Sequence, residues 1–135
     1  MAKVQQLTFL KVHTNDEPGV LLRIMEALKA KNISLKSLWG FGKQDGSAEI
    51  YFIGKAPEKI EQALQTNEMV IEKGAAFFTQ GTDKAGALLK ALETLSDAKI
   101  NIKGIHAIAV GGKFGSLIWV NESDVPKAAK ALNAQ

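Results

Sequence analysis

Hydrophobic residues recur along the chain with two different spacings, one typical of strands and one typical of helices. Apolar residues at Leu7, Phe9 and Val12 predict a strand over residues 7–14. Leu21, Ile24 and Leu28 then follow at helical spacing, which predicts a helix over residues 18–30. The other elements expected in this half are strands over residues 33–41 and 48–53 joined by a turn at Asp45 and Gly46, a helix over residues 57–64, and a strand over residues 69–72.

The same succession of elements recurs in the second half of the chain. A spacing of 67 residues, as between Asp16 and Asp83, gives eight identities between residues 16–53 and 83–120 without a gap. Ordinary residue usage would give roughly two by chance. The match extends to apolar pairs such as Phe52 with Trp119. The elements expected in this half are strands over residues 75–80, 100–110 and 114–120, and helices over residues 85–98 and 125–134.

Each repeat therefore reads strand-helix-strand-strand-helix, and a further edge strand would complete a ferredoxin-like unit. We expect an α+β fold of two βαββαβ units, with antiparallel sheets that carry helices on one face. The repeat boundary divides the chain into domains of residues 1–68 and 69–135. Residues 69–72 supply the edge strand of the first unit. Nothing comparable follows the final helix, so residues 2–5 are expected to supply the edge strand of the second unit, in an exchange between the repeats.

The turn between the first strand and the first helix is the most informative motif. Asn15 or Asp16 is expected to cap the helix, and Pro18 suits its first turn because it has no amide to leave unsatisfied. Gly19 has no Cβ, so a ligand or another backbone segment can approach it. A helix start with exposed amides attracts a carboxylate, and a nearby acidic side chain attracts an ammonium group. These features suit a zwitterionic amino acid, although such a turn also begins helices that bind nothing.

The stretch Asn15-Asp16-Glu17-Pro18-Gly19-Val20-Leu21, followed by Lys31-Asn32-Ile33-Ser34 after the helix, resembles the ACT family of amino-acid-binding regulatory domains. The resemblance covers about residues 6–134, although the second repeat has Ala85 where the first has Pro18. It implies that an effector binds between units, at the loop before the first helix and at the start of the second strand. The residues assigned to ligand binding in this way are Thr14, Asn15, Asp16, Glu17, Pro18, Gly19, Val20, Leu21, Ile33 and Ser34 in the first repeat, and Asp83, Lys84, Gly86, Ala87, Ile100 and Asn101 in the second.

The residue composition argues against metal-binding and catalytic sites. The chain has no cysteine and only two histidines, His13 and His106, so we expect no metal site, no cofactor and no catalytic set. Charged residues make up 23% of the chain, with a net charge of +3. Together with the resemblance to the ACT family, this implies a cytoplasmic, non-enzymatic regulator that binds a free amino acid, forms a homodimer, and signals allosterically to an enzyme or transcription factor in trans.

Two alternatives remain open on the same fold. An RNA-binding module would use sheet aromatics such as Trp39 and Tyr51, but its basic glycine-aromatic signature is missing. An acylphosphatase-like enzyme would need an arginine in the anion-binding loop, whereas Arg23 falls on the body of the first helix.

Overall fold

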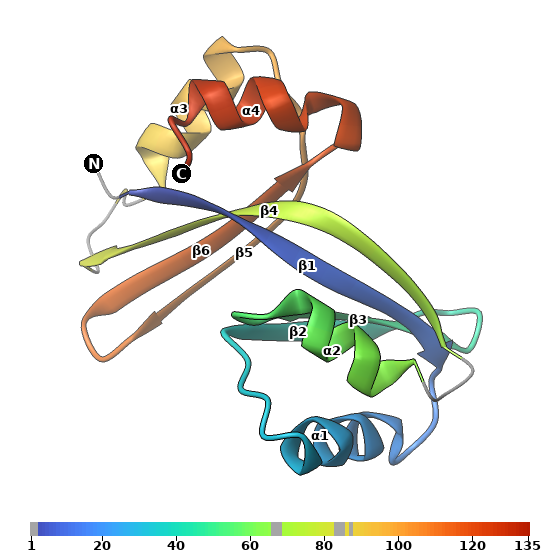
Figure 1. The fold of residues 1–135 in the computed structure, drawn as a ribbon. Helices are drawn as coiled ribbons and strands as arrows, with labels where there is room; N and C mark the ends of the chain where they lie inside the picture. Colours follow the sequence, from blue (N-terminus) through green and yellow to red (C-terminus); the bar gives the residue numbers. More distant parts are fainter. Residues whose placement is uncertain (1–2, 66–68, 83–85, 87) are drawn as a thin grey trace. The chain divides into compact units, whose positions relative to one another are not determined.

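Two long strands organise the fold, and each belongs to two compact units. A computed structural model describes residues 3–65, 69–82, 86 and 88–135. Strand β1 spans Val4–Asn15 and strand β4 spans Val70–Thr82 (Figure 1). The two edge strands expected over residues 2–5 and 69–72 are therefore not separate elements, because each continues into the long strand that follows it. One unit comprises residues 8–74, and the other combines residues 1–7 with residues 75–135.

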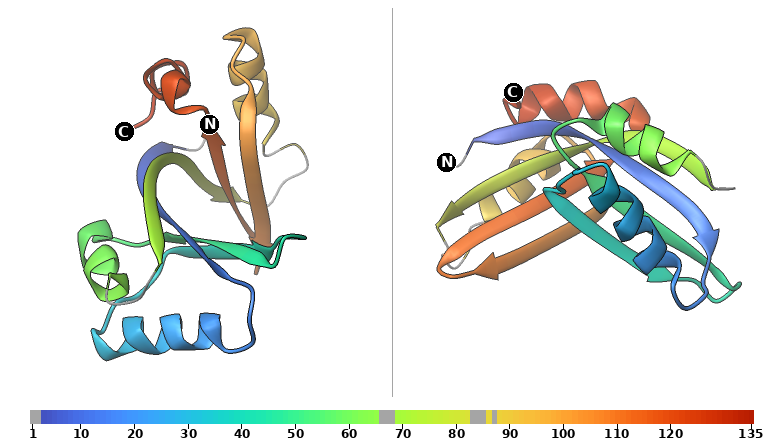
Figure 2. Two further views of the ribbon diagram at one scale, coloured as in Figure 1. Left: turned by 90° about the vertical axis from the view of Figure 1, so that its right-hand side faces the viewer. Right: turned by 60° about the horizontal axis from the view of Figure 1, so that its bottom comes forward.

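The unit of residues 8–74, here called the α1–α2 unit, contains the first repeat. Its remaining elements are α1 (Val20–Ala30), β2 (Ser37–Gly42), β3 (Ser47–Ile53) and α2 (Pro57–Leu64). The strand order is β2-β3-β1-β4, and β3 is antiparallel to both β1 and β2. Both helices cover the same face of these strands (Figure 2), where the core forms. The buried core residues are Leu10, Val12, Val20, Ile24, Leu28, Ile50, Phe52, Ile60 and Leu64.

The other unit, here called the α3–α4 unit, contains the second repeat. Its elements are α3 (Leu89–Asp97), β5 (Ile102–Val110), β6 (Lys113–Val120), a short 3-10 turn at Glu122–Asp124, and α4 (Val125–Ala131). The strand order is β1-β4-β6-β5, with β6 antiparallel to β4 and β5. Its buried core residues are Val4, Phe77, Ala91, Leu95, Ile100, Ile118, Val120, Ala128 and Leu132. The expected α+β class with two ferredoxin-like units is confirmed.

The expected exchange of edge strands is also confirmed for the residues that the structure describes. Val4 is only 3% exposed and belongs to the core of the α3–α4 unit. The amide of Gln135 donates to the carbonyl of Val4 at 2.9 Å, and the amide of Gln6 donates to the carbonyl of Gln135 at 2.9 Å. Ala2, which we also expected in this strand, lies outside the described residues. The beginning of β1 therefore completes a sheet whose other strands come from the second repeat.

The two repeats do not align without a gap through their last strands, β3 and β6. Leu10 lies opposite Phe52 in one unit, and Phe77 lies opposite Ile118 in the other. Leu10 and Phe77 occupy equivalent positions in the sequence repeat, so the equivalent of Phe52 is the core residue Ile118. The predicted match of Phe52 with Trp119 is therefore wrong by one residue, because the hairpin of the second repeat is one residue shorter.

Several predicted element boundaries also move. Helix α1 begins at Val20 and α3 at Leu89, both later than expected, and β2 begins only at Ser37.

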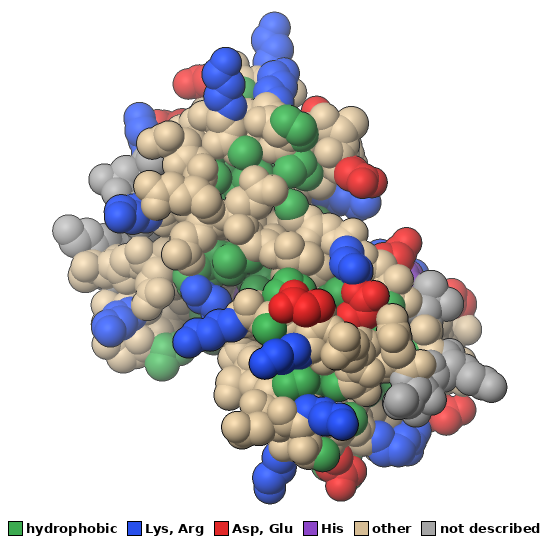
Figure 3. Space-filling model, viewed as in Figure 1, with side chains coloured by type: hydrophobic (Ala, Val, Ile, Leu, Met, Phe, Trp, Pro, Cys, Tyr) green, Lys and Arg blue, Asp and Glu red, His purple; other side chains and the backbone are tan. Residues whose placement is uncertain are grey.

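Charged side chains of both signs are interspersed over the face shown in Figure 3. None of the described helices is long and apolar enough to cross a membrane.

Helices α1 and α3 end in the same way, with different residues at the critical position. Asn32 and Lys99 follow the helices with φ of 55° and 58°, in the left-handed region. After each, the next amide donates to the carbonyl five residues earlier, at 2.9 and 3.0 Å, which satisfies a helix-terminal acceptor. Asparagine tolerates this conformation well, whereas lysine is strained in it.

We predict that Lys99→Asn raises the free energy of unfolding by about 0.5 kcal/mol, because it relieves left-handed strain. The reciprocal change Asn32→Lys should lower it by a similar amount. Urea unfolding of both variants provides the measurement. Shifts of the same sign in the two variants would contradict this explanation.

We also predict that Val4→Ala lowers the free energy of unfolding by about 1–3 kcal/mol, because it removes buried methyl groups from the core of the α3–α4 unit. Amide hydrogen exchange should show the loss of protection within residues 75–135 rather than within residues 8–74. Lys3→Ala, which changes an exposed neighbour, is the matched control. Equal effects of the two substitutions would be inconsistent with a core role for Val4.

Candidate functional site

The corner between β1 and α1 is closed by backbone geometry rather than by a side-chain cap. Gly19 is the N-cap residue, with φ of 88° in the left-handed region, which glycine adopts without strain. The amide of Val20 donates to the Glu17 carbonyl at 3.3 Å, and that of Arg23 donates to the Gly19 carbonyl at 3.0 Å. No side chain caps the helix. The prediction that Asn15 or Asp16 caps α1 is therefore wrong, because the left-handed Gly19 displaces the helix start beyond their reach.

Asp16 instead crosses toward β2. Its amide donates to the Gly46 carbonyl at 2.9 Å, which ties the corner to the β2–β3 hairpin. Its carboxylate lies so close to Gly42 that a Cβ at that glycine would overlap it. The position of the carboxylate therefore depends on the absence of a side chain at Gly42.

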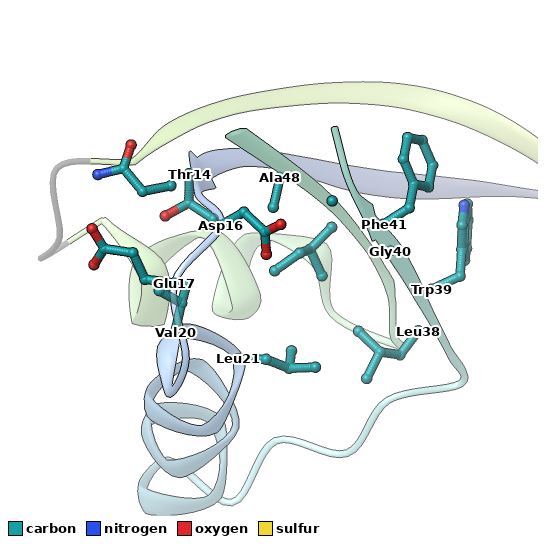
Figure 4. A pocket seen from close by; sticks show the side chains of 13 residues that line it. Thr14, Asp16, Glu17, Val20, Leu21, Leu38, Trp39, Gly40, Phe41 and Ala48 are labelled. Atoms are coloured by element: carbon teal, nitrogen blue, oxygen red, sulfur yellow. The ribbon is translucent and has the colours of Figure 1, made fainter. Parts of the chain in front are cut away.

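A pocket of about 210 Å³ lies between this corner and the strands β2 and β3. Val20, Ala48 and Ile50 are buried and form its apolar floor. Leu21 and Leu38, which are 44% and 37% exposed, lie at its mouth. Figure 4 shows the Asp16 side chain directed between the corner and β2, with Trp39 and Phe41 turned away from Leu21. The pocket thus combines an anionic group, a helix start and an apolar floor.

The helix-free face of the α1–α2 unit carries a separate polar network. Glu49 is 8% exposed and its carboxylate accepts hydrogen bonds from Lys43 at 2.7 Å and from the Tyr51 hydroxyl at 3.2 Å. Lys11 forms an ion pair with the same carboxylate at 3.4 Å. The hydrogen bond from Lys43, with the nearby Lys11 charge, holds the pKa of Glu49 below its ordinary value despite burial. Burial raises the pKa of Tyr51.

His13 extends this network rather than the pocket. Its Nε2 lies 2.6 Å from a Glu72 carboxylate oxygen, and this hydrogen bond is the main cause that lowers the pKa of Glu72. In the register of β1 with β3, His13 lies opposite Glu49, whereas Thr14 and Ala48 form the adjacent pair at the pocket. Successive strand residues face opposite sides of a sheet, so His13 points away from the pocket.

No protein-family model and no curated protein sequence matches the chain. Several solved structures, in contrast, resemble it in fold. A Bacteroides thetaiotaomicron protein superposes with a TM-score of 0.82 at 22% identity, covering 96% of this chain and 88% of that one. The regulatory subunit of aspartate kinase from Thermus thermophilus, in its ligand-free form, gives a TM-score of 0.67 at 15% identity, covering 98% and 94%. That from Thermus flavus gives 0.63 at 16% identity, covering 98% and 97%.

The chain has a tandem ACT-type fold. At these identities the likeness concerns the fold, and it extends over nearly the full length of the regulatory subunits. The α1–α2 unit and the α3–α4 unit are the two ACT-type units. The two Thermus proteins are named as regulatory subunits of aspartate kinase.

The first ACT-type unit brings together only part of the residue set predicted from the sequence. Thr14, Asn15, Asp16, Glu17, Val20 and Leu21 line the pocket. Pro18 and Gly19 form the turn without lining it. Ile33 and Ser34 lie elsewhere, in a second hollow of about 530 Å³. The pocket residues that sequence reasoning missed are Leu38, Trp39, Gly40, Phe41, Gly42, Ala48 and Ile50. The alternate glycines Gly40 and Gly42 on one strand were the available signal for a close approach on that face.

The second ACT-type unit is described less completely at the equivalent corner. Gly86 has φ of 80°, close to the 88° of its counterpart Gly19. Asp83, Lys84 and Ala87 lie outside the described residues. Ile100 and Asn101 line a hollow of about 330 Å³ with Leu92, Leu95, Ser96, Lys99 and Ile102. Among the described residues of the chain, no group of three or more potential ligands could hold a metal ion.

The polar network predicts a specific loss of stability in acid. Because the pKa of Glu49 is depressed in the folded state, its contribution is complete above its ordinary value of 4.5 and is lost as the pH falls through the folded-state value. We predict that Glu49→Gln reduces the acid-dependent loss of stability while lowering stability at neutral pH, where Lys43 loses its partner. Urea unfolding from about pH 7 to about pH 3 measures both effects. The control Glu93→Gln, at an exposed position, should leave the pH profile of stability unchanged. If the profile of Glu49→Gln also matched that of the unmodified protein, the stabilising role of the Glu49 carboxylate would be refuted.

Proposed function

We propose that the chain is a small non-enzymatic regulator that binds a free amino acid in the pocket at the β1–α1 corner. The observation that carries the proposal is the convergence of the Asp16 carboxylate, the start of α1 and an apolar floor on one small pocket. The fold likeness to regulatory subunits of aspartate kinase supports a regulatory role.

Each part of an amino acid has a complementary group in this pocket. The Asp16 carboxylate suits the ammonium group, as a charge-assisted hydrogen bond. The first-turn amides of α1, which have no side-chain cap, suit the carboxylate group. Val20, Ala48 and Ile50 offer an apolar surface to the side chain. This division favours a small aliphatic amino acid over a charged or aromatic one.

The size of the pocket supports a small ligand. Pockets for drug-sized molecules begin at about 300 Å³, whereas this pocket has about 210 Å³. The partly exposed Leu21 and Leu38 at its mouth leave apolar surface for a second copy of the chain to cover. In the proposal, a homodimer closes over the amino acid, and binding shifts the population of this packing arrangement.

We propose that a partner responds to this population shift, and that the partner is an enzyme or transcription factor regulated in trans in the cytoplasm. The second ACT-type unit presents Gly86 at the equivalent corner, but the first unit is the proposed binding unit because Pro18 stiffens its turn.

Two observations weigh against the RNA-binding alternative. Trp39 stacks on Tyr51 with ring centroids 4.8 Å apart, but Tyr51 is only 6% exposed. On the same face, the Glu49 carboxylate pairs with Lys11 and Lys43, which leaves these two cations less available to phosphates. The acylphosphatase alternative lacks its arginine, since Arg23 lies within α1.

We predict that a thermal-shift screen of the twenty amino acids identifies a small aliphatic ligand, and that Asp16→Ala abolishes the shift. A ligand at 100 times its dissociation constant stabilises the folded state by about 2.7 kcal/mol, which is readily measured. Gly42→Val should act in the same way, because the added Cβ displaces the Asp16 carboxylate.

Asp97→Ala is the matched control, since it removes an exposed carboxylate in the other unit. It should leave the shift intact. A screen without any response, or an Asp16→Ala variant that responds like the unmodified protein, would exclude this pocket as an amino-acid site.

A further inference from the structure

The second hollow of the α1–α2 unit is basic and differs in chemistry from the pocket at Asp16. It has a volume of about 530 Å³ and lies between the segment that follows α1 and the start of α2. Its lining residues include Lys31, Lys36, Lys55 and Lys59, and the described lining contains no carboxylate. Four lysines therefore contribute to the lining of one concave surface.

Two carboxylates of this unit are paired with lysines outside the hollow. Glu49 is paired with Lys43 and Lys11, and Glu61 is paired with Lys73 at 2.6 Å. Among the ion pairs of the described residues, none involves Lys31, Lys55 or Lys59. Lys31, Lys55 and Lys59 thus leave positive charge available to a ligand of the hollow.

Two of the lysines occupy positions that oppose the stability of their own helix. Helix α2 begins at Pro57 without a side-chain cap, so its positive dipole end lies beside Ala56 in the hollow. Lys55 precedes this end, and Lys59 lies in the first turn beside Glu58. A cation is unfavourable at this end of a helix, whereas the Glu58 carboxylate is favourable. Lys31 differs, because it follows the C-terminal end of α1, where a cation is favourable. Local structure therefore explains Lys31 but not Lys55 and Lys59.

The hollow also has an apolar wall. Ile33 and Leu35 pack against the core of the unit and line the hollow with Ala56. Its volume lies within the range of about 300–1,000 Å³ that is typical of small-molecule pockets. A ligand that matches this surface carries several negative charges at one end and an apolar or flat body at the other.

We propose that this hollow binds a phosphorylated small molecule of nucleoside-polyphosphate type. Lysine binds phosphate as a mobile point charge, so several lysines suit a flexible polyphosphate chain. Ile33, Leu35 and Ala56 receive the apolar body. The confined volume favours a small molecule over a nucleic acid, which would require an extended basic stripe. The site is independent of the amino-acid pocket and gives the chain a second input.

The test uses isothermal titration calorimetry of the full chain with ATP, tripolyphosphate, a polyglutamate peptide and anionic lipid vesicles, without divalent cations and at fixed ionic strength. We predict that ATP binds more tightly than tripolyphosphate, and that Lys55→Gln with Lys59→Gln weakens ATP binding at least about tenfold. The same double variant without ligand should melt about 1–4 °C higher, because it removes two cations from the positive end of α2.

Lys127→Gln with Lys130→Gln is the matched control, since it removes two exposed lysines from the other unit. Its affinity for ATP should remain that of the unmodified protein, and Asp16→Ala should also retain ATP binding. Equal weakening in both double variants would show that binding follows net charge and would overturn the proposal. So would the absence of ATP binding, equal affinities for ATP and tripolyphosphate, or binding of only the peptide or the vesicles.

Discussion

Strands β1 and β4 impose the constraint on which the rest of the structure depends, because each must satisfy two cores. β1 contributes Val4 to the core of the α3–α4 unit and Leu10 and Val12 to that of the α1–α2 unit. β4 contributes Phe77 to the former, while Ile71 packs against the latter. A one-residue slip of either strand would turn its apolar residues to the opposite face. The register of these strands therefore fixes both units at once.

This constraint explains why the fold was largely predictable from the sequence. Helical and strand periodicities gave the element types, and the repeat indicated that two units share one plan. The missing edge strand then followed from the repeat, since Val4 and Ile71 hold equivalent positions. The alignment of the repeats without a gap failed at β6. Five residues, 43–47, lie between the paired residues Gly42 and Ala48, whereas four residues, 110–113, lie between the equivalent pair Ala109 and Phe114. Such a deletion is invisible to a comparison that counts identities without strand pairing.

The residues of the candidate site at the β1–α1 corner were predictable from the sequence, but their geometry was not. Short-range patterns identify a turn between a strand and a helix, so Asp16 and Gly19 were found. The left-handed Gly19 removes the need for a side-chain cap, and Asp16 contacts Gly42, which lies in another strand. Contacts between residues distant in the sequence have no local signal. For the same reason, Ile33 and Ser34 were grouped with Asp16 although they line a different hollow.

The hydrogen bonds between Gln135 and the start of β1 have a consequence for synthesis on the ribosome. The α1–α2 unit holds all of its residues once position 74 has emerged, so it can close while translation continues. The segment containing Val4 emerges well before its hydrogen-bond partner, residue 135. An edge of β1 consequently stays unfilled until residue 135 emerges, and until then it offers unpaired backbone to other chains.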